Sequence, residues 1–183
     1  MMDSRTAYTI LVGLVAAERV AELGLAHRHD VALRAAGGVE VGSAAYPWMV
    51  ALHTAFPIAC LAEVWCLRRP WIPPLGAVML LAIACAMGLR AWTVAALGPR
   101  WTTRVLVVPG SLRVTTGPYR LLRHPNYLAV AVEVAALPLV HAAWTTAVVF
   151  SVLNGMLLRA RIRAENAALQ KWCGVPGHVS ERA

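Results

Sequence analysis

The sequence predicts an all-α, polytopic membrane protein with about five transmembrane helices, the last two of which form a helical hairpin. Of its 183 residues, 59% are hydrophobic and only 14% are charged, whereas soluble domains average roughly 45–50% and about 25%. The apolar residues gather in runs close to the length of about 20 residues that a helix needs to cross a bilayer. The 17 Lys and Arg residues cluster at the ends of these runs, which indicates lipid headgroups rather than nucleic acid as their partners.

The first apolar run, Thr6 to Leu25, predicts the first span. Its second half carries Glu18, Arg19 and Glu22. Glu18 and Glu22 share one helix face because they are four residues apart, and charges at this depth are costly in lipid. We therefore expect these side chains to face the protein interior or the headgroup zone. The polar segment that follows, His27 to Ala45, is predicted to be a loop.

The second and third spans are predicted at Tyr46 to Leu67 and at Leu75 to Leu97. Titratable side chains lie inside both runs, His53 and Glu63 in the second and Arg90 in the third. Such residues are expensive within a bilayer, so they are either functional or paired with one another. For His53 we expect a hydrogen-bonded contact with a helix.

The longest non-apolar segment runs from Arg100 to Pro125, and its β-branched stretch from Trp101 to Val108 is followed by a Pro-Gly turn signal. The fourth and fifth spans are predicted at Asn126 to Val140 and at Ala142 to Leu158. Because their connection is so short, the two helices are expected to form an antiparallel hairpin. The end of the chain, which contains Gly174 to Gly177, is predicted to be a loose tail.

The distribution of basic residues predicts the orientation. With five spans, the loop 27–45, the segment 98–125 and the C-terminus share one side of the membrane and hold twelve Lys and Arg residues. The other side holds three, namely Arg5, Arg68 and Arg69. Because basic residues favour the cytoplasmic side, the 98–125 segment and the C-terminus are predicted to be cytoplasmic. The Arg-rich, Lys-poor and Ala-rich composition indicates a bacterium, and therefore its inner membrane.

The densest group of chemically capable side chains lies between Thr116 and Tyr127, immediately before the fourth apolar run. It contains Tyr119, Arg120, Arg123, His124, Asn126 and Tyr127. Pro125 suits the first turn of a helix, whose free backbone amides form an anion site. The carboxylate of an amino-acid-like ligand fits there, with His124 or Tyr127 as donors. An interfacial belt of Tyr and Arg is the alternative explanation, but the ordered string before a hairpin favours a site.

A second group follows the hairpin, from Arg159 to Asn166. Arg161 and Glu165 are four residues apart, so they can pair on a helix. The three arginines of this group also suit a stop signal at the membrane exit, but that explanation does not account for the acid and the amide that follow them. Glu133, on the first helix of the hairpin, either approaches a ligand or pairs with Arg90.

The two groups together resemble the isoprenylcysteine carboxyl methyltransferase family. The resemblance rests on Gly117-Pro118-Tyr119, then Arg123-His124-Pro125-Asn126-Tyr127, a hairpin, and Arg161 through Glu165 with Leu169. The N-terminal half is similar to a bacterial branch of this family through Glu18-Arg19, Gly38 to Gly42 and Tyr46-Pro47. That branch is associated with O-methylation of alkylpyrones and related long-chain polyketide phenols or enols.

The resemblance implies a helical membrane enzyme that has no Rossmann domain and uses S-adenosylmethionine (SAM). Carried over residue by residue, it implies that the cofactor contacts Tyr119, Arg123, His124, Pro125, Tyr127 and Glu133. It places the catalytic residues Arg161, Glu165 and Asn166 near the methyl donor and acceptor. The family usually has a Glu-Glu doublet where this chain has Glu165-Asn166, and an amide can hydrogen-bond but cannot act as a base.

The sequence thus predicts a single domain, residues 1–183, in which 1–97 supply three spans and 98–183 supply the cofactor-binding segment, the hairpin and a C-terminal arm. The predicted function is SAM-dependent O-methylation of a lipid-like acceptor, such as an alkylpyrone, a related phenol or enol, or a carboxylate. Four alternatives stay open: a phospholipid N-methyltransferase, an isoprenylcysteine carboxyl methyltransferase, an NADPH-dependent membrane reductase and a non-catalytic scaffold. The expected partners are this substrate and membrane lipids, without nucleic acid and without a metal, since no Cys-x-x-Cys pair occurs.

Overall fold

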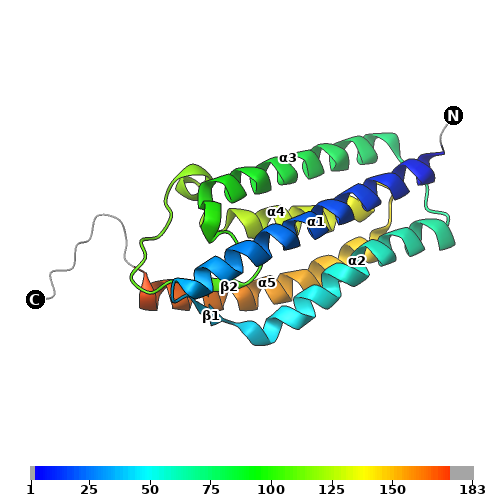
Figure 1. Ribbon diagram of the computed structural model, residues 1–183. Coiled ribbons are helices and arrows are strands. Elements are labelled where there is room, and N and C mark those ends of the chain that lie inside the picture. The colour runs from blue at the N-terminus through cyan, green and yellow to red at the C-terminus, as the bar shows by residue number, and fades with distance from the viewer. Residues whose placement is uncertain (1–2, 174–183) are drawn as a thin grey trace, which may run out of the picture.

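The structure is a bundle of long helices that carries a two-stranded antiparallel ribbon at one end (Figure 1). The computed structural model describes residues 3–173, so the predicted loose tail from Gly174 to Gly177 lies outside the described residues. Within that range the long helices are α1 (Ser4–Ala35), α2 (Tyr46–Cys66), α3 (Pro73–Leu97), α4 (Pro125–Leu139) and α5 (Trp144–Trp172). The strands are β1 (Val39–Val41) and β2 (Val105–Val107), and the short 3-10 turns are η1 (Ser43–Ala45), η2 (Gly98–Arg100) and η3 (Gly117–Arg120). We call the end of the bundle with the strands and the last turns of α5 the ribbon end.

Three helical segments within residues 3–173 are long and apolar enough to cross a membrane, namely Ser43–Cys66, Pro73–Arg100 and Trp144–Trp172. Helix α4 is also apolar but has only 15 residues, and α1, with 32 residues, is interrupted by charges. Large apolar side chains point outward from these helices; Leu81 and Met156 are each 65% exposed. Outward apolar surface of this kind suits a lipid environment, and the predicted all-α membrane fold is confirmed.

Helix α1 extends farther than the sequence predicted. It continues to Ala35, so the predicted loop from His27 to Ala45 begins only after this residue. The additional turns are stabilised by contacts with the rest of the protein. For example, the ring Nδ1 of His29 lies 2.7 Å from the backbone oxygen of Trp101. The chain then turns at Gly37, whose φ of 82° is a left-handed conformation that glycine adopts without steric cost.

The ribbon joins two segments that are far apart in the sequence. Strands β1 and β2 pair antiparallel, with Val39 opposite Val107 and Val41 opposite Val105. The sequence predicted the β-branched stretch around β2 but no partner strand for it. One face of the ribbon packs against the end of α5, where Val105, Val107 and Ala168 are buried together. The ribbon therefore fastens the α1–α2 and α3–α4 connections to the last turns of α5.

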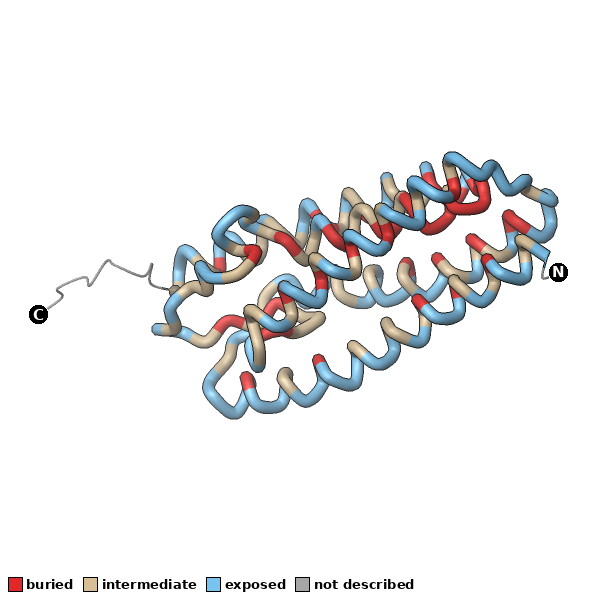
Figure 2. The backbone as a smooth tube through the Cα atoms, turned by 90° about the horizontal axis from the view of Figure 1, so that it is seen from above, coloured by how far each residue is buried: buried red, intermediate tan, exposed pale blue. Residues whose placement is uncertain are grey.

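The predicted hairpin is present, and its turn is anchored from α2. Figure 2 shows the buried residues on the inward sides of the helices, while the outward sides are exposed. Residues 140–143, which join α4 to α5, are all buried. The carboxylate of Glu63 accepts hydrogen bonds from the backbone amides of Thr145 at 3.2 Å and Thr146 at 2.6 Å. Arg69 pairs with the same carboxylate at 2.6 Å, so this intramembrane acid has a structural partner.

Candidate active site

A cavity of about 800 Å³ opens at the ribbon end of the bundle. Its walls come from the long segment between α3 and α4, from β2, and from the last turns of α1 and α5. The segment between α3 and α4 is held close to α3 by Gly117, whose φ is 60°. A Cβ atom at Gly117 would lie 2.8 Å from the Cβ of Ala96, so a side chain does not fit there.

The motif that the sequence singled out forms the start of α4. His124 is the N-cap of this helix and Pro125, its first residue, is buried. The rings of His124 and Tyr127 stack, with centroids 5.4 Å apart and 21° between their planes. Both line the cavity, as do Tyr119 and Arg123. Burial and a nearby carboxylate raise the pKa of the Tyr119 phenol, so this group remains a hydrogen-bond donor at neutral pH.

The hydroxyl of Tyr127 connects α4 to α5. Arg161 Nε donates to this hydroxyl at 2.9 Å, and the hydroxyl donates to the carboxylate of Glu165. Arg161 also donates through Nη2 to the backbone oxygen of Thr103. Among residues 3–173 no direct ion pair joins Arg161 to Glu165, so the direct pairing that their spacing allowed is replaced by a shared contact with Tyr127.

A second contact joins the same two helices. The ring Nε2 of His124 donates to the side-chain oxygen of Asn166 at 3.1 Å, and its Nδ1 lies 3.9 Å from the carboxylate of Glu165. Asn166 and Glu165 both line the cavity. The segment before the hairpin and the arm after it therefore meet. Of the residues predicted for the cofactor, His124 and Tyr127 contact the three predicted catalytic residues. Tyr119 and Arg123 line the same cavity, whereas Pro125 and Glu133 do not.

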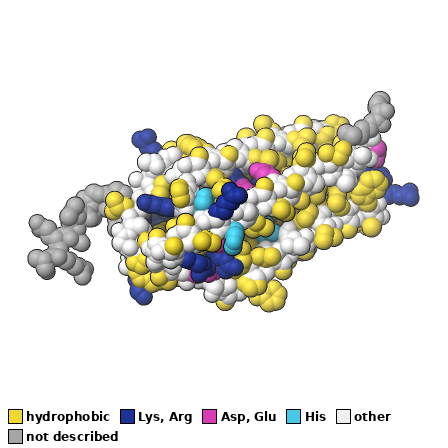
Figure 3. Space-filling model, viewed as in Figure 1, with side chains coloured by type: hydrophobic (Ala, Val, Ile, Leu, Met, Phe, Trp, Pro, Cys, Tyr) yellow, Lys and Arg dark blue, Asp and Glu magenta, His cyan; other side chains and the backbone are white. Residues whose placement is uncertain are grey.

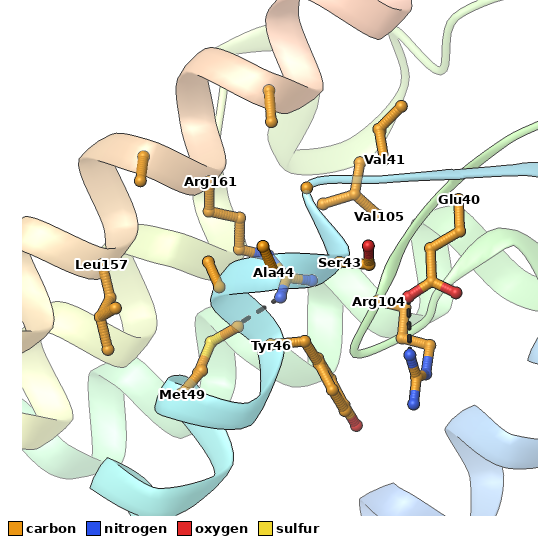
Figure 4. A pocket seen from close by; sticks show the side chains of 14 residues that line it. Glu40, Val41, Ser43, Ala44, Tyr46, Met49, Arg104, Val105, Leu157 and Arg161 are labelled. Atoms are coloured by element: carbon orange, nitrogen blue, oxygen red, sulfur yellow. Dashed lines mark hydrogen bonds and ion pairs between the residues drawn. The ribbon is translucent and has the colours of Figure 1, made fainter.

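A smaller hollow of about 170 Å³ lies on the other side of Arg161 (Figure 4). Its lining is mostly apolar and comes from β1, from the start of α2 and from α5. Figure 4 shows Arg161 reaching from α5 toward Met49 of α2, and Nη1 of Arg161 lies 3.7 Å from the Met49 sulfur. Arg161 and Arg104 line both hollows, so these two guanidinium groups lie where the larger cavity, whose lining is the more polar, adjoins the smaller and more apolar hollow.

Sequence reasoning missed the ion-pair network that holds this wall in place. Arg104 pairs with Glu40 at 2.6 Å and with Asp30 at 3.6 Å, and its guanidinium lies 4.0 Å from the ring centroid of Tyr46. Glu40 also pairs with Arg34. The network joins α1, β1, α2 and Arg104, the residue before β2, which the non-local ribbon brings together. The acidic and basic residues were visible in the sequence, but no short-range spacing linked them.

We expect the Glu40 network to make stability depend on pH. Burial raises the pKa of Glu40, but the hydrogen bonds and charges of Arg104 and Arg34 outweigh burial and place the pKa below its ordinary value. Because a lowered pKa stabilises the fold only while the group is ionised, the stabilisation is complete above the ordinary glutamate pKa of about 4.3. It disappears as the pH falls through the lower, folded value.

The measurement is the melting temperature of the wild-type protein and of Glu40→Gln in detergent between pH 7 and pH 3.5. The wild type should melt higher at neutral pH, with a constant difference that shrinks only below about pH 4.3. A difference that stays the same down to the lowest pH would show that the carboxylate charge is not the stabilising feature.

A cluster of five charged side chains lies deeper in the bundle. Arg19 pairs with Glu18 at 3.0 Å, with Glu22 at 2.5 Å and with Glu133 at 3.7 Å. Arg90 pairs with Glu133 at 2.9 Å and with Glu22 at 3.4 Å. Of the two surroundings predicted for the α1 charges, the protein interior or the headgroup zone, the structure shows the interior for Arg19 and Glu22. Two roles were predicted for Glu133, an approach to the ligand and a pair with Arg90. The structure shows the pair with Arg90, and Glu133 is not part of the cavity lining.

The comparison with known families adds to this geometry. The model of the isoprenylcysteine carboxyl methyltransferase (ICMT) family matches residues 77–171, which is more than half of the chain. This chain belongs to the ICMT family. The matched range contains α3, the segment that lines the cavity, the hairpin and α5 through Lys171. The chain is therefore a membrane protein of a methyltransferase family, and methyltransferases of this family generally use SAM.

Two bacterial proteins are similar to this ICMT-family chain over most of its length. The uncharacterized protein YpbQ of Bacillus subtilis (strain 168) is 34% identical over 168 residues, which cover 90% of this chain and 98% of YpbQ. An uncharacterized protein of Haemophilus influenzae (strain ATCC 51907 / DSM 11121 / KW20 / Rd) is 25% identical over 161 residues, which cover 87% of this chain and 93% of that protein. No solved structure gives a significant match.

Proposed function

We propose that this protein uses SAM to O-methylate a lipid-like acceptor, such as an alkylpyrone, a related long-chain phenol or enol, or a carboxylate. The observation that carries the proposal is the meeting of Tyr127, Arg161 and Glu165 at the wall between a polar cavity and an apolar hollow. A polar cofactor and an apolar acceptor need such a junction, because the two reactants come from water and from lipid.

The polar cavity fits the amino-acid part of SAM. The start of α4 offers free backbone amides, which favour a carboxylate, and the neighbouring His124 and Tyr119 supply donors on the same wall. Glu165 supplies a carboxylate that suits an ammonium group. When bound, SAM supplies a methyl group on a positively charged sulfur, and the sulfur–carbon bond breaks as the acceptor oxygen–carbon bond forms, leaving a neutral thioether.

Arg161 is the proposed catalytic residue for the acceptor. A guanidinium is a cation with several N–H donors in one plane, so Arg161 can hold an ionised oxygen in line with the methyl donor. Tyr127 and the backbone oxygen of Thr103 fix its orientation, and a fixed donor is effective because no reorganisation accompanies the reaction. Alignment of the two reactants can itself contribute on the order of 7–11 kcal/mol.

The side chain of Asn166 supports an acidic acceptor. An amide cannot take up a proton, so this position offers no general base, and Glu165 is engaged by the hydroxyl of Tyr127. An acidic enol, a phenol or a carboxylate can enter already ionised and then releases no proton during transfer. The apolar hollow beside Arg161, with Met49, Leu157 and Ala164 in its lining, suits the hydrocarbon part of such a molecule.

We also propose that the whole chain is one domain, with residues 1–97 and 98–183 in their predicted roles, and that the cavity faces the cytoplasm of a bacterium. The described parts of the three basic segments that the residue counts assign to one side, namely the residues that follow α1, the segment 98–125 and the last turns of α5, converge on the ribbon end (Figure 1). Arg5 lies in the first turn of α1, and Arg68 and Arg69 lie in the connection between α2 and α3, at the opposite end of the bundle. SAM is a cytosolic cofactor, so this orientation gives it direct access.

Cofactor binding is the first test of the proposal. A ligand at about 100 times its Kd stabilises a protein by about 2.7 kcal/mol, which raises the melting temperature of a chain of this size by roughly 5–10 °C. We expect SAM to produce this shift in detergent-solubilised wild-type protein and NADPH to produce none. His124→Ala should lose the shift, whereas His27→Ala, an exposed histidine of α1, should retain it.

The outcomes separate the alternatives. A shift with NADPH and none with SAM would identify a reductase, and no shift with either ligand would favour a non-catalytic scaffold. The acceptor is then sought by mass spectrometry of lipid extracts from cells with and without the gene. A lipid whose mass differs by one methyl group, at an oxygen rather than a nitrogen, is the expected product.

A further inference from the structure

The side chains that line the large cavity carry more positive charge than the neighbouring carboxylates neutralise. Its lining contains a single carboxylate, Glu165, among the described residues, and five arginines: Arg100, Arg104, Arg113, Arg123 and Arg161. Two of these are compensated, because Arg104 pairs with Glu40 and Asp30 and Arg161 shares Tyr127 with the carboxylate of the cavity. Figure 3 shows charged side chains gathered on the half of the molecule near the ribbon end.

Arg100 and Arg113 both line this cavity, and the side chain of Arg100 reaches the backbone next to Arg113. Nη1 of Arg100 donates to the backbone oxygen of Leu112 at 2.8 Å, and Leu112 is the residue before Arg113. Within residues 3–173 neither guanidinium makes an ion pair, and the Nε of Arg113 is buried without a hydrogen-bond partner. A buried N–H group without an acceptor is costly, so this pair is suited to a ligand that supplies anionic oxygens.

SAM does not supply enough negative charge for this purpose. It has one carboxylate, for which Arg123 and the start of α4 are available, and its ammonium and sulfonium add positive charge to the cavity. The cavity volume of about 800 Å³ lies near the upper end of the roughly 300–1,000 Å³ that is usual for small-molecule sites. A second ligand with an anionic head group therefore has both room and a charged partner.

We propose that Arg100 and Arg113 form an anion subsite that binds a carboxylate or phosphate head group of the methyl acceptor. This inference rests on the proposed function and narrows its substrate class to anionic amphiphiles. Guanidinium groups bind carboxylate and phosphate oxygens in pairs of parallel hydrogen bonds. Beside them the apolar side chain of Leu112 is 55% exposed, which gives an amphiphile an apolar contact next to its charge.

The test uses full-length protein in a neutral detergent and three probes with the same dodecyl chain: dodecyl phosphate, dodecyl maltoside and dodecyltrimethylammonium. Dodecyl phosphate is expected to raise the melting temperature, while the other two are not. Because a hydrogen bond to a charged group is worth about 1.5–3 kcal/mol, Arg113→Gln should weaken dodecyl phosphate binding at least about tenfold. Arg100→Gln should act in the same direction, and added salt should weaken binding to the wild type.

Arg120→Gln is the matched control. Arg120 is exposed and lies in the same connecting segment, but it does not line the cavity. Equal weakening by Arg120→Gln and Arg113→Gln would show that the basic surface attracts anions in general, which would overturn the subsite. Equal binding of the three probes would overturn it as well.

SAM binding distinguishes a failed inference from a failed function. Arg113→Gln should keep the thermal shift with SAM, which also shows that the variant is folded. A wild-type protein that binds SAM but not dodecyl phosphate would remove the subsite and leave the methyltransferase proposal standing. A protein that binds dodecyl phosphate and is stabilised by NADPH instead of SAM would keep the anion site and remove the methyltransferase proposal, since the phosphates of the nucleotide would then be its ligand.

Discussion

Replacement of Arg161 by alanine is expected to lower methyl transfer by about 100-fold or more while the protein still binds SAM. Arg161 lines both hollows, as Arg104 does, and it is the one of the two that contacts Tyr127, so it is placed to stabilise an acceptor oxygen as the methyl group arrives. Removal of one such fixed donor typically costs about 10²–10³ in rate. The effect should fall on kcat rather than on the thermal shift with SAM, because the proposed partner of Arg161 is the acceptor.

The lysine variant tests whether geometry or charge matters at this position. Arg161 reaches the hydroxyl of Tyr127 through Nε and the backbone oxygen of Thr103 through Nη2. A lysine ammonium is a single point charge and cannot reproduce this fork. Arg161→Lys should therefore remain strongly impaired, and rates close to wild type in Arg161→Lys would show that charge alone is sufficient.

Arg163 provides the control on the same helix. It lies two residues after Arg161, is exposed, and does not line either hollow. Arg163→Ala should insert into the membrane and turn over substrate like the wild type. The measurement is transfer of a labelled methyl group into lipid extract in membranes that contain equal amounts of each variant. Turnover of Arg161→Ala at the level of Arg163→Ala would remove Arg161 from the reaction.

The helices of this protein were predictable from sequence because the bilayer imposes a length and a composition on each one. The starts of α2 and α4 are marked by Pro47 and Pro125 in their first turns, where proline costs no hydrogen bond. The ends of α1 and α5 were not predictable in this way. Their last turns are polar and stay helical because they pack against the ribbon, and β1 and β2 pair across a separation that no local pattern encodes.

The candidate site, too, was predictable from the sequence only in part. His124, Tyr127, Arg161 and Glu165 could be named because they sit in two dense strings of unusual residues beside a hairpin, and a hairpin brings its flanking segments together. The contacts of Arg104 with Glu40 could not be named, since 64 positions separate these residues. The sequence also could not predict that the hydroxyl of Tyr127 links α4 to α5, because helical spacing allowed a direct pair between Arg161 and Glu165 instead.

The largest effect on stability is expected from Glu133→Leu in the deep charge cluster. The carboxylate of Glu133 and the guanidinium of Arg90 have only 8% of their side-chain surface exposed each. Removal of one member of a buried ion pair typically lowers the free energy of unfolding by about 3–5 kcal/mol. In Glu133→Leu the buried guanidinium of Arg90 keeps only its longer contact with Glu22, at 3.4 Å. We expect a clear fall in melting temperature in detergent, and a smaller fall for Glu18→Leu, whose side chain is 36% exposed.

The double variant Arg90→Met with Glu133→Leu tests whether these two charges serve the packing of the helices or the reaction. If the two charges serve only to bind α3 to α4, an apolar pair of similar size should restore most of the lost stability, because such replacements are often neutral or stabilising. Methyl transfer should return with the fold, since Glu133 lies outside the lining of the cavity. A double variant that is stable and binds SAM but does not transfer methyl groups would contradict this, because the acid would then be needed by the reaction itself rather than by the packing of the helices.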